Sequence, residues 1–256
     1  MVTSPFDLTG KVAIITGGNG GIGLGMARGL ANAGAAIVIA GRSEAKSKVA
    51  VAEIEKLGAK ALAIVVDVTD KAAVEKMVAT TETKFGRLDI LINNAGINIR
   101  NPVQTLALDD WRSVIDTNLT SAFLCAQAAY PAMKKQGRGK IINTGSMMSI
   151  FATAYAPAYA ASKGGIVQLT KALAASWAAD NIQANAILPG WIDTDMTRKA
   201  REQVDALHDS VLARTPARRW GHIDDLAGTA VFLSSSASDF VTGTAIPVDG
   251  GYSVQG

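Results

Sequence analysis

Cysteine and histidine are scarce in this sequence. Among its 256 residues there are one cysteine, Cys125, and two histidines, His208 and His222. A single cysteine excludes an internal disulfide, and two histidines leave little material for a zinc site or a histidine-based triad. Cys125 lies in a long apolar helical pattern, which favours a core position over a reactive thiolate. We expect no metal site, so the chemistry must use other side chains.

An excess of charge of one sign is lacking too. The chain has 25 lysines and arginines against 22 aspartates and glutamates, a formal net charge of +3. So small an excess gives no argument for a nucleic-acid partner. The densest basic cluster follows a predicted helix, where cations stabilise a helix C-terminus, and we interpret it in that way. It consists of Lys134, Lys135, Arg138 and Lys140.

Targeting and membrane-spanning segments are also lacking. No apolar run reaches the roughly 18 residues that a spanning helix needs. Residues 1–10 include Pro5 and Asp7 and have neither a basic start nor a long apolar stretch, which argues against a secretory signal. We therefore expect a cytoplasmic protein with no membrane partner.

The chain does contain short apolar runs that alternate with longer helical patterns from end to end. This alternation is typical of βαβ units, and strands rich in β-branched residues are typical of a parallel sheet covered on both faces. We predict an α/β fold: a single Rossmann-type doubly wound parallel sheet of about seven strands. No linker divides the chain, so residues 1–256 are expected to form one dinucleotide-binding and catalytic domain. The predicted strands are 12–16, 36–40, 61–66, 90–92, 140–144, 183–188 and 245–248, and the predicted helices include 21–33, 71–85 and 157–179.

A glycine-rich segment, 16–23, directly follows the first predicted strand and opens a helix. Glycines here let the backbone approach a pyrophosphate, and the helix N-terminus presents free N–H groups to the anion. The segment fits two registers, Gly18/Gly20/Gly23 or Gly17/Gly21/Gly23. A flexible turn is the alternative interpretation, and a mononucleotide loop is disfavoured because no Gly-Lys-Ser/Thr follows.

The end of the second strand bears on cofactor choice. Gly41 stands where an NAD-binding chain usually has an acidic residue for the ribose, and Arg42 offers a fork suited to a 2′-phosphate. The sequence favours NADP(H), with NAD(H) as a second cofactor, unless Arg42 is simply a solvated loop residue. Asp67 could accept a hydrogen bond from adenine, or could form a helix cap with Thr69 and Asp70.

Tyr159 and Lys163 are spaced i, i+4 on a predicted helix and therefore share one face. A tyrosine has a pKa of about 10, and a neighbouring cation favours its phenolate. Tyr159 could then act as a general acid/base. A surface packing pair is the alternative, and it is the commoner role of such a spacing.

Six features together make the chain resemble the short-chain dehydrogenase/reductase family. They occur in the family's order over nearly the whole chain: the loop 16–23, Asn93-Asn94-Ala95-Gly96, Asn118, Ser146 thirteen residues before a tyrosine, the pair Tyr159 and Lys163, and Pro189-Gly190. The resemblance implies a hydride-transferring oxidoreductase that uses NADP(H) or NAD(H) without a metal. A non-catalytic dinucleotide-binding protein is a distant alternative.

The resemblance also implies roles for individual residues. Tyr159 would exchange a proton with the reacting oxygen, and Lys163 would lower the pKa of Tyr159 and hold the ribose. Ser146 would hydrogen-bond the reacting oxygen, and Asn118 would position a water that relays protons past Lys163.

A set of cofactor-binding residues follows from the same resemblance. Residues 94–96 would line the adenosine side, and Ile192 and Thr194 would meet the carboxamide. Gly20 departs from the family, because many NADP-using relatives have a basic residue there, which leaves Arg42 to carry the preference almost alone. The full set is Gly17, Asn19, Gly21, Ile22, Gly23, Arg42, Asp67, Val68, Asn94, Ala95, Gly96, Tyr159, Lys163, Pro189, Gly190, Ile192 and Thr194.

Two other polar residues have competing interpretations. Ser146 as a hydrolase nucleophile is disfavoured, because its surroundings are not G-x-S-x-G and neither histidine suits a triad. Tyr155 has no lysine four residues on, so we interpret it as a wall of the substrate pocket.

Substrate choice should depend on the loops beyond the strand ends. These are 97–101, 147–155 and about 191–220, of which the last could close as a lid or be an ordinary connection. Within the family the chain is most similar to gluconate 5-dehydrogenases and related sugar-acid dehydrogenases, and Arg100 could pair with a sugar-acid carboxylate. A 3-oxoacyl carrier-protein reductase is an alternative. So is a dehydrogenase of cyclic alcohols or ketones, whose pocket Met147, Met148, Phe151 and Trp191 could line.

The pattern over 111–133 is apolar on more than one face, so we expect it to bury a face against another subunit. The family resemblance implies a homotetramer, with residues 248–256 near an interface. The only other expected partner is a small-molecule substrate.

Overall fold

One seven-stranded parallel sheet organises the molecule, in the strand order β3-β2-β1-β4-β5-β6-β7. The structure is a computed structural model that describes residues 4–255; Met1–Thr3 and Gly256, at the two ends of the predicted domain, lie outside the described residues. The order runs outward from β1 in both directions, which confirms the doubly wound α/β prediction. The strands are β1 (Val12–Thr16), β2 (Ala36–Gly41), β3 (Ala61–Val65), β4 (Ile90–Asn93), β5 (Gly139–Thr144), β6 (Ile182–Pro189) and β7 (Ala245–Val248).

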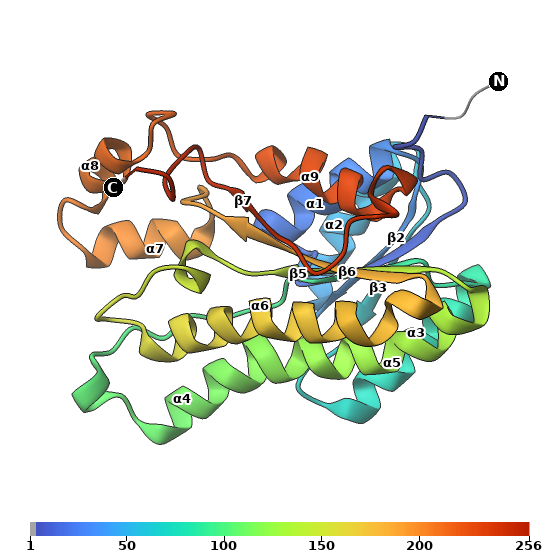
Figure 1. The fold of residues 1–256 in the computed structure, drawn as a ribbon, viewed down its shortest axis with the longest axis horizontal. Helices are drawn as coiled ribbons and strands as arrows, with labels where there is room; N and C mark the ends of the chain where they lie inside the picture. Colours follow the sequence, from blue (N-terminus) through green and yellow to red (C-terminus); the bar gives the residue numbers. More distant parts are fainter. Residues whose placement is uncertain (1–3, 256) are drawn as a thin grey trace.

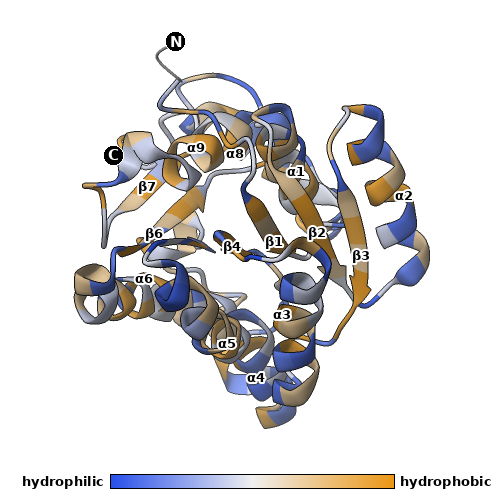
Figure 2. Ribbon diagram, turned by 90° about the vertical axis from the view of Figure 1, so that its right-hand side faces the viewer, coloured by the Kyte–Doolittle hydropathy of each residue, from blue (hydrophilic) through white to orange (hydrophobic). Residues whose placement is uncertain are grey.

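Helices cover both faces of the sheet (Figures 1 and 2). α1, α2 and α9 pack on one face, and α3, α5 and α6 pack on the other with α4 at their end. α7 and α8 lie apart, toward the end of the molecule where the chain also terminates. The helices are α1 (Gly21–Asn32), α2 (Glu44–Lys56), α3 (Lys71–Phe85), α4 (Leu108–Ile115), α5 (Ser121–Gln136), α6 (Pro157–Trp177), α7 (Asp195–Gln203), α8 (Leu207–Arg214) and α9 (Ala227–Ser234).

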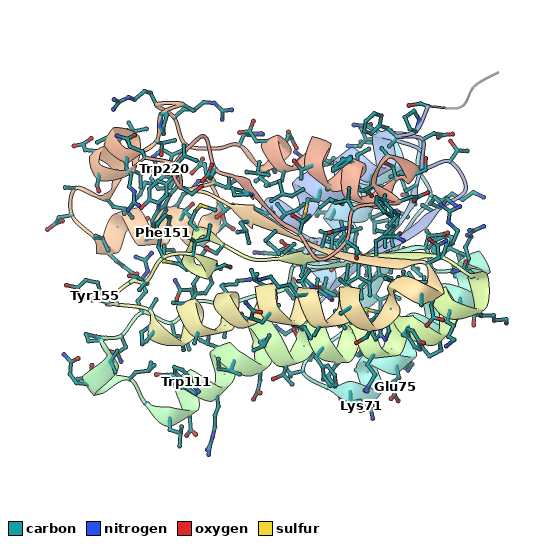
Figure 3. The ribbon with its side chains drawn as sticks, viewed as in Figure 1. Lys71, Glu75, Trp111, Phe151, Tyr155 and Trp220 are labelled. Carbon is teal, nitrogen blue, oxygen red and sulfur yellow. The ribbon has the colours of Figure 1, made fainter. Side chains whose placement is uncertain are left out.

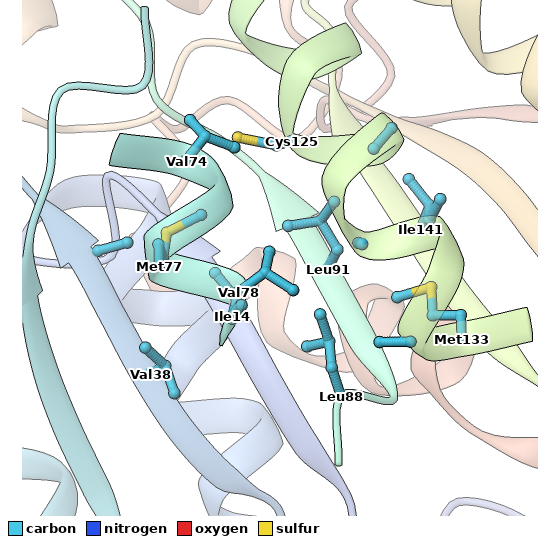
Figure 4. Close-up of a cluster of buried hydrophobic side chains, with 14 of the residues drawn as sticks. Ile14, Val38, Val74, Met77, Val78, Leu88, Leu91, Cys125, Met133 and Ile141 are labelled. Carbon is cyan, nitrogen blue, oxygen red and sulfur yellow. The ribbon is translucent and has the colours of Figure 1, made fainter. Parts of the chain in front are cut away.

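The core consists of two apolar layers, one on each side of the sheet. All residues of β1 and β6 are buried, as strands covered on both faces require. In the layer of Figure 4, Cys125 of α5 packs near Val74 of α3 and is almost fully buried. Burial raises the pKa of the Cys125 thiol to about 12, so it remains a thiol near neutral pH, and the prediction of a core cysteine is confirmed.

Some element boundaries differ from the prediction by one or two residues. β3 ends at Val65, because it is an edge strand whose pairing with β2 stops at Gly41. α6 ends at Trp177, because a short 3-10 turn (Ala178–Asp180) follows it and leads into Asn181 at a φ of 58°. Asn118 lies in a five-residue π-helical segment, η2 (Asp116–Thr120), between α4 and α5.

One part of the basic-cluster interpretation is wrong. Lys134 and Lys135 do lie in the last turn of α5. Lys140, by contrast, lies in β5 and is buried, and its Nζ donates to Asp239 at 2.8 Å and to Ser238 at 3.2 Å. Lys140 therefore joins β5 to the segment at Ser238 and Asp239.

No helix in the part of the chain that the structure describes is both long and apolar enough to span a membrane.

Candidate active site

A cleft of about 800 Å³ opens at the carboxyl ends of the strands, beside the N-terminus of α1. This is where parallel α/β sheets generally bind ligands. It collects most residues singled out in the sequence: Gly17, Asn19, Gly21, Ile22, Arg42, Asp67, Val68, Asn94, Ala95, Gly96, Ser146, Tyr159, Lys163, Pro189, Gly190, Ile192 and Thr194. Gly23 and Asn118 do not line the cleft, because both are buried just behind its wall.

The glycine loop adopts one of the two registers. Gly17 and Gly21 have φ values of 63° and 52°, a region that glycine tolerates far better than other residues. A Cβ on Gly23 would lie 2.4 Å from the carbonyl oxygen of Gly17, so no side chain fits there. Gly20 has open space around it. The structure therefore requires glycine at 17, 21 and 23.

The first turn of α1 is suited to an anion. Its N-cap makes no side-chain hydrogen bond, and no acidic residue occupies the first turn. The backbone N–H groups there are left for a ligand, and the helix dipole favours negative charge at the same point. A dinucleotide pyrophosphate fits this cradle.

The far end of the cleft bears two basic side chains. Arg42 and Lys46, four residues apart at the start of α2, both line it and both are exposed. The sequence did not single out Lys46. Only its position in the first turn of α2, four residues after Arg42, brings it to the cleft. A 2′-phosphate would meet two cations there, so Arg42 is not alone.

Asp67 also reaches this end, but its carboxylate already has partners. Its Oδ1 accepts from the backbone N of Thr69 at 2.9 Å and from the Thr69 hydroxyl at 2.7 Å. These hydrogen bonds, and to a smaller extent the charge of Arg42, lower the pKa of Asp67. Asp70 is the actual N-cap of α3. Asp67 keeps its place on the cleft wall with one oxygen engaged.

Tyr159 and Lys163 extend from the first two turns of α6, which begins at Pro157. Lys163 is only 4% exposed, so the two do not form a surface pair. Its Nζ lies 5.6 Å from the centre of the Tyr159 ring and donates to the carbonyl oxygen of Thr144 at 2.7 Å. Burial lowers the pKa of Lys163 to about 8.

The pKa of Tyr159 moves opposite to the direction that the family resemblance implies. Burial raises it, and a hydrogen bond with Ser146 offsets part of that rise. Lys163 faces the same burial, and its ammonium already donates to the carbonyl oxygen of Thr144. In the chain alone Tyr159 is therefore a protonated acid at neutral pH, and forming its phenolate requires further positive charge in the cleft.

Ser146 lies directly after β5, at the N-terminus of the short 3-10 helix η3 (Met147–Ser149). Its Oγ accepts from the backbone N of Met148 at 3.1 Å, which leaves the hydroxyl proton for another acceptor. Neither histidine lines the cleft: His208 accepts from the Trp220 indole, and His222 caps η5 (Ile223–Leu226). With no histidine near it, Ser146 is not arranged as a hydrolase nucleophile.

Asn118 uses its whole side-chain amide within the protein. Its Oδ1 accepts from the backbone N of Ile97 at 2.8 Å, and its Nδ2 donates to the Ile97 carbonyl at 2.9 Å and to Ser162 at 3.1 Å. A Cβ on Gly96 would lie 3.2 Å from Asn118 Oδ1 and 3.7 Å from Lys163 Nζ. Asn118 is thus beside Lys163, with both Nδ2 protons donated within the protein and one hydrogen bond accepted at Oδ1.

Thr16 is a structural residue of the site whose role the sequence did not reveal. Its buried hydroxyl accepts from the backbone N of Asn94 at 2.9 Å and of Ala95 at 3.1 Å. The side chain of Asn94 returns a hydrogen bond to the Thr16 carbonyl at 3.1 Å. These contacts join the ends of β1 and β4 and so fix two walls of the cleft together.

The segment over 191–220 forms α7 and α8 and borders the cleft. Thr194 caps α7, and its methyl lies 3.5 Å from where a Cβ on Gly21 would be. Asp193 pairs with Arg198 at 3.0 Å and also with Arg201. Trp220, labelled in Figure 3, stacks on His208, meets Trp191 edge to face and lies under the Arg201 guanidinium.

The expected apolar pocket wall is absent from the cleft. Tyr155 is 64% exposed and points away at the end of the molecule (Figure 3). Met147 is buried against Leu188, and Met148 and Phe151 pack on the same cluster. None of these side chains lines the cleft, and neither does Trp191. Residues 4–255 contain no group of three acidic, histidine or cysteine side chains placed to hold a metal.

Comparison with known proteins decides the family. A family model described as enoyl-(acyl carrier protein) reductase, one of the short-chain dehydrogenase models, matches residues 17–253. The chain belongs to the short-chain dehydrogenase/reductase family. As a family member it is an NAD(P)-dependent oxidoreductase acting on CH–OH groups.

Several relatives of this short-chain dehydrogenase are named for sugar acids. The 2-dehydro-3-deoxy-D-gluconate 5-dehydrogenase of Formosa agariphila is 44% identical over 96% of the chain and 94% of the relative. The gluconate 5-dehydrogenase of Gluconobacter oxydans is 42% identical over 97% of each. A gluconate 5-dehydrogenase from Burkholderia cenocepacia, solved with NADP and tartrate, superposes with a TM-score of 0.94 at 44% identity over 98% of each chain.

Proposed function

We propose that the chain transfers a hydride between NADP(H) and a secondary alcohol or ketone of a sugar acid or polyol, with Tyr159 as the proton donor and acceptor. The observation that carries this proposal is the meeting of Tyr159, Lys163 and Ser146 in one cleft with the glycine loop. The named activities of the relatives support the substrate class, and the NADP in the Burkholderia structure supports the cofactor.

The protein residues divide the work of the reaction. When bound, the nicotinamide supplies or accepts the hydride. In reduction the Tyr159 hydroxyl donates its proton to the substrate oxygen. Its raised pKa keeps that proton on Tyr159 until this step but also makes the phenol a weaker acid, so positive charge beside it must assist the transfer. The Ser146 hydroxyl, whose proton is not used by Met148, hydrogen-bonds the same oxygen as charge develops there. Lys163 binds the ribose. The proton that Tyr159 gives up is replaced along a route that passes Lys163 and Asn118.

The cleft itself favours a polar substrate over an apolar cyclic one. Beyond the dinucleotide-binding residues, its lining includes Ser113, Asp116, Thr117, Asp193 and Arg198. Met147, Met148 and Phe151, which would suit a cyclic ketone, pack away from it, although Ile97 and Met196 also line the cleft. Arg100 of the loop that follows Ile97 is partly buried, and burial lowers its pKa. Arg100 does not line the cleft, so its expected pairing with a sugar-acid carboxylate requires the loop over 97–101 to bring its guanidinium inward.

A substrate panel run with both cofactors tests this function. Gluconate and related sugar acids should give the highest kcat/KM, with NADP(H) preferred over NAD(H). The panel also includes other polyols, cyclic alcohols and an acyl thioester. Faster turnover of the thioester would instead indicate a carrier-protein reductase, and faster turnover of a cyclic ketone would contradict the substrate class. The Tyr159→Phe variant, run on each substrate, gives the background rate.

We also propose a homotetramer whose contacts include α4 and α5. Trp111 of α4, labelled in Figure 3, and Phe123 of α5 are 37% and 44% exposed, so these neighbouring helices present two large apolar side chains to solvent. Light scattering should give about four times the chain mass of 26.5 kDa. Phe123→Arg should lower that mass, whereas Val49→Arg on α2, an apolar position that is more exposed (69%) and lies away from both helices, should not. A monomeric mass for the unmodified protein would refute the proposal.

A further inference from the structure

Ser146 and Tyr159 must meet although they lie on different elements. Ser146 follows β5, and Tyr159 lies in the first turn of α6. Between them the chain forms η3 and then a loop over 150–156, in which Ile150 and Tyr155 are 54% and 64% exposed. Figure 3 shows Phe151 and Tyr155 of this loop at the end of the molecule. Phe151 of this loop packs on the cluster around Met147, but these apolar contacts do not join Ser146 to Tyr159.

The hydroxyl of Ser149 bridges the two elements directly. Its Oγ donates to the carbonyl oxygen of Lys163 on α6 at 2.7 Å. The same Oγ accepts from the backbone N of Ser146 at 3.2 Å. A carbonyl can only accept and an amide N–H can only donate, so both directions are fixed. One side chain therefore ties the backbone of Ser146 to the backbone of Lys163.

Lys163 is held at both of its ends by the segment around Ser146. Its carbonyl oxygen takes the Ser149 hydroxyl, and its Nζ donates to the carbonyl oxygen of Thr144 at 2.7 Å. Thr144 and Ser149 lie on either side of Ser146 in the chain. One turn before Lys163, Tyr159 is carried by the same helix, so the two contacts also set its position relative to Ser146.

Space around the bridge is limited, which keeps it in one geometry. A Cβ on Gly145 would lie 3.0 Å from Ser149 Oγ and 2.3 Å from a methyl of Leu188. Ser149 is partly buried, and Gly145 and Met147 are buried. The Ser146 Oγ accepts from the backbone N of Met148 at 3.1 Å, which restricts where the hydroxyl can lie.

We propose that Ser149 is a positioning residue for hydride transfer: it holds Ser146 where its hydroxyl hydrogen-bonds the Tyr159 hydroxyl and the reacting oxygen. The inference rests on the proposed function, because it assigns Ser149 to the proton-transfer pair named there. Ser149 itself touches neither substrate nor cofactor in this role. It acts through the backbone of Ser146 and of Lys163.

Ser149→Ala removes the hydroxyl and keeps the volume nearly unchanged. We expect kcat to fall about tenfold to a hundredfold, the scale that follows from a displaced reacting group. NADPH binding, measured by fluorescence titration, should stay unchanged. In the oxidative direction the rising limb of kcat/KM against pH should move to higher pH, because Tyr159 loses part of the hydrogen bond that lowers its pKa.

Two further variants separate positioning from general damage. Ser149→Thr keeps the hydroxyl and should recover most of kcat and the original pH limb. Ile150→Ala changes the exposed neighbour in the same loop and should behave as the unmodified protein. Wild-type kcat and an unmoved pH limb in Ser149→Ala would overturn the proposal. So would a Ser149→Thr variant as slow as the alanine variant, or a loss that comes only with weaker NADPH binding and lower thermal stability.

Tyr159→Phe makes the two failures distinguishable. If Tyr159→Phe is inactive while Ser149→Ala is normal, only the role of Ser149 falls. If Tyr159→Phe retains full turnover, the proposed function falls with it.

Discussion

Replacing Tyr159 with phenylalanine should lower kcat by about a thousandfold, within the range that general acid/base catalysis contributes. The ring still fills its place on α6, so cofactor binding should not change. The phenolic proton has no substitute nearby. The Ser146 hydroxyl is an aliphatic alcohol, a far weaker acid than a phenol, and the Lys163 ammonium already donates to the carbonyl oxygen of Thr144.

A matched control for this variant lies four residues earlier. Tyr155→Phe removes the same atom from a tyrosine that is exposed and does not line the cleft. Its kcat should equal that of the unmodified protein under the same conditions. Stopped-flow or steady-state assays of nicotinamide absorbance measure both variants. Full turnover by Tyr159→Phe on the true substrate would remove the proposed mechanism.

Features that depend only on the local sequence were predictable. The strands of the sheet could be identified because buried parallel strands are continuous apolar runs, and their ends then place the cleft. Tyr159 and Lys163 share a face because a helix has a fixed period. The glycine loop was predictable in kind but not in register, because the register is decided by the positive φ of Gly17 and Gly21 and by the open space around Gly20.

Features that depend on packing between distant segments were not predictable. Nothing in the local sequence reveals that α4 passes into α5 through a π-helical segment. Nor does it reveal that the Asn118 amide hydrogen-bonds the backbone of Ile97. The direction of the Tyr159 pKa is of the same kind. The spacing to Lys163 suggests a lowered pKa for Tyr159. Burial by the surrounding elements has the larger effect and raises that pKa instead.

The substrate wall is the clearest difference between sequence and structure. Met147 was one of four side chains that could line an apolar substrate pocket. Its side chain instead packs against Ala186 and Leu188 of β6. The turn of η3 decides this, because the capping hydrogen bonds between Ser146 and Ser149 rotate Met147 toward the sheet.

Reversing the charge of Arg42 should change the cofactor preference of the enzyme. Arg42→Asp is expected to lower kcat/KM with NADPH by about a hundredfold, since a lost charged hydrogen bond and a new repulsion each weaken phosphate binding. The same change should leave NADH turnover intact or improve it, because a carboxylate at this position accepts from the ribose hydroxyls. Kinetics with both cofactors, at constant ionic strength, give the ratio.

Lys46 and Lys48 separate a local contact from the general field of the protein. Both lysines lie on α2, but only Lys46 lines the cleft, whereas Lys48 pairs with Glu44 at 2.7 Å. Lys46→Ala should lower kcat/KM with NADPH by about tenfold, because it removes one phosphate contact. Lys48→Ala removes the same charge and should leave the preference unchanged. An unchanged preference in Arg42→Asp would show that the 2′-phosphate is not recognised at the end of β2.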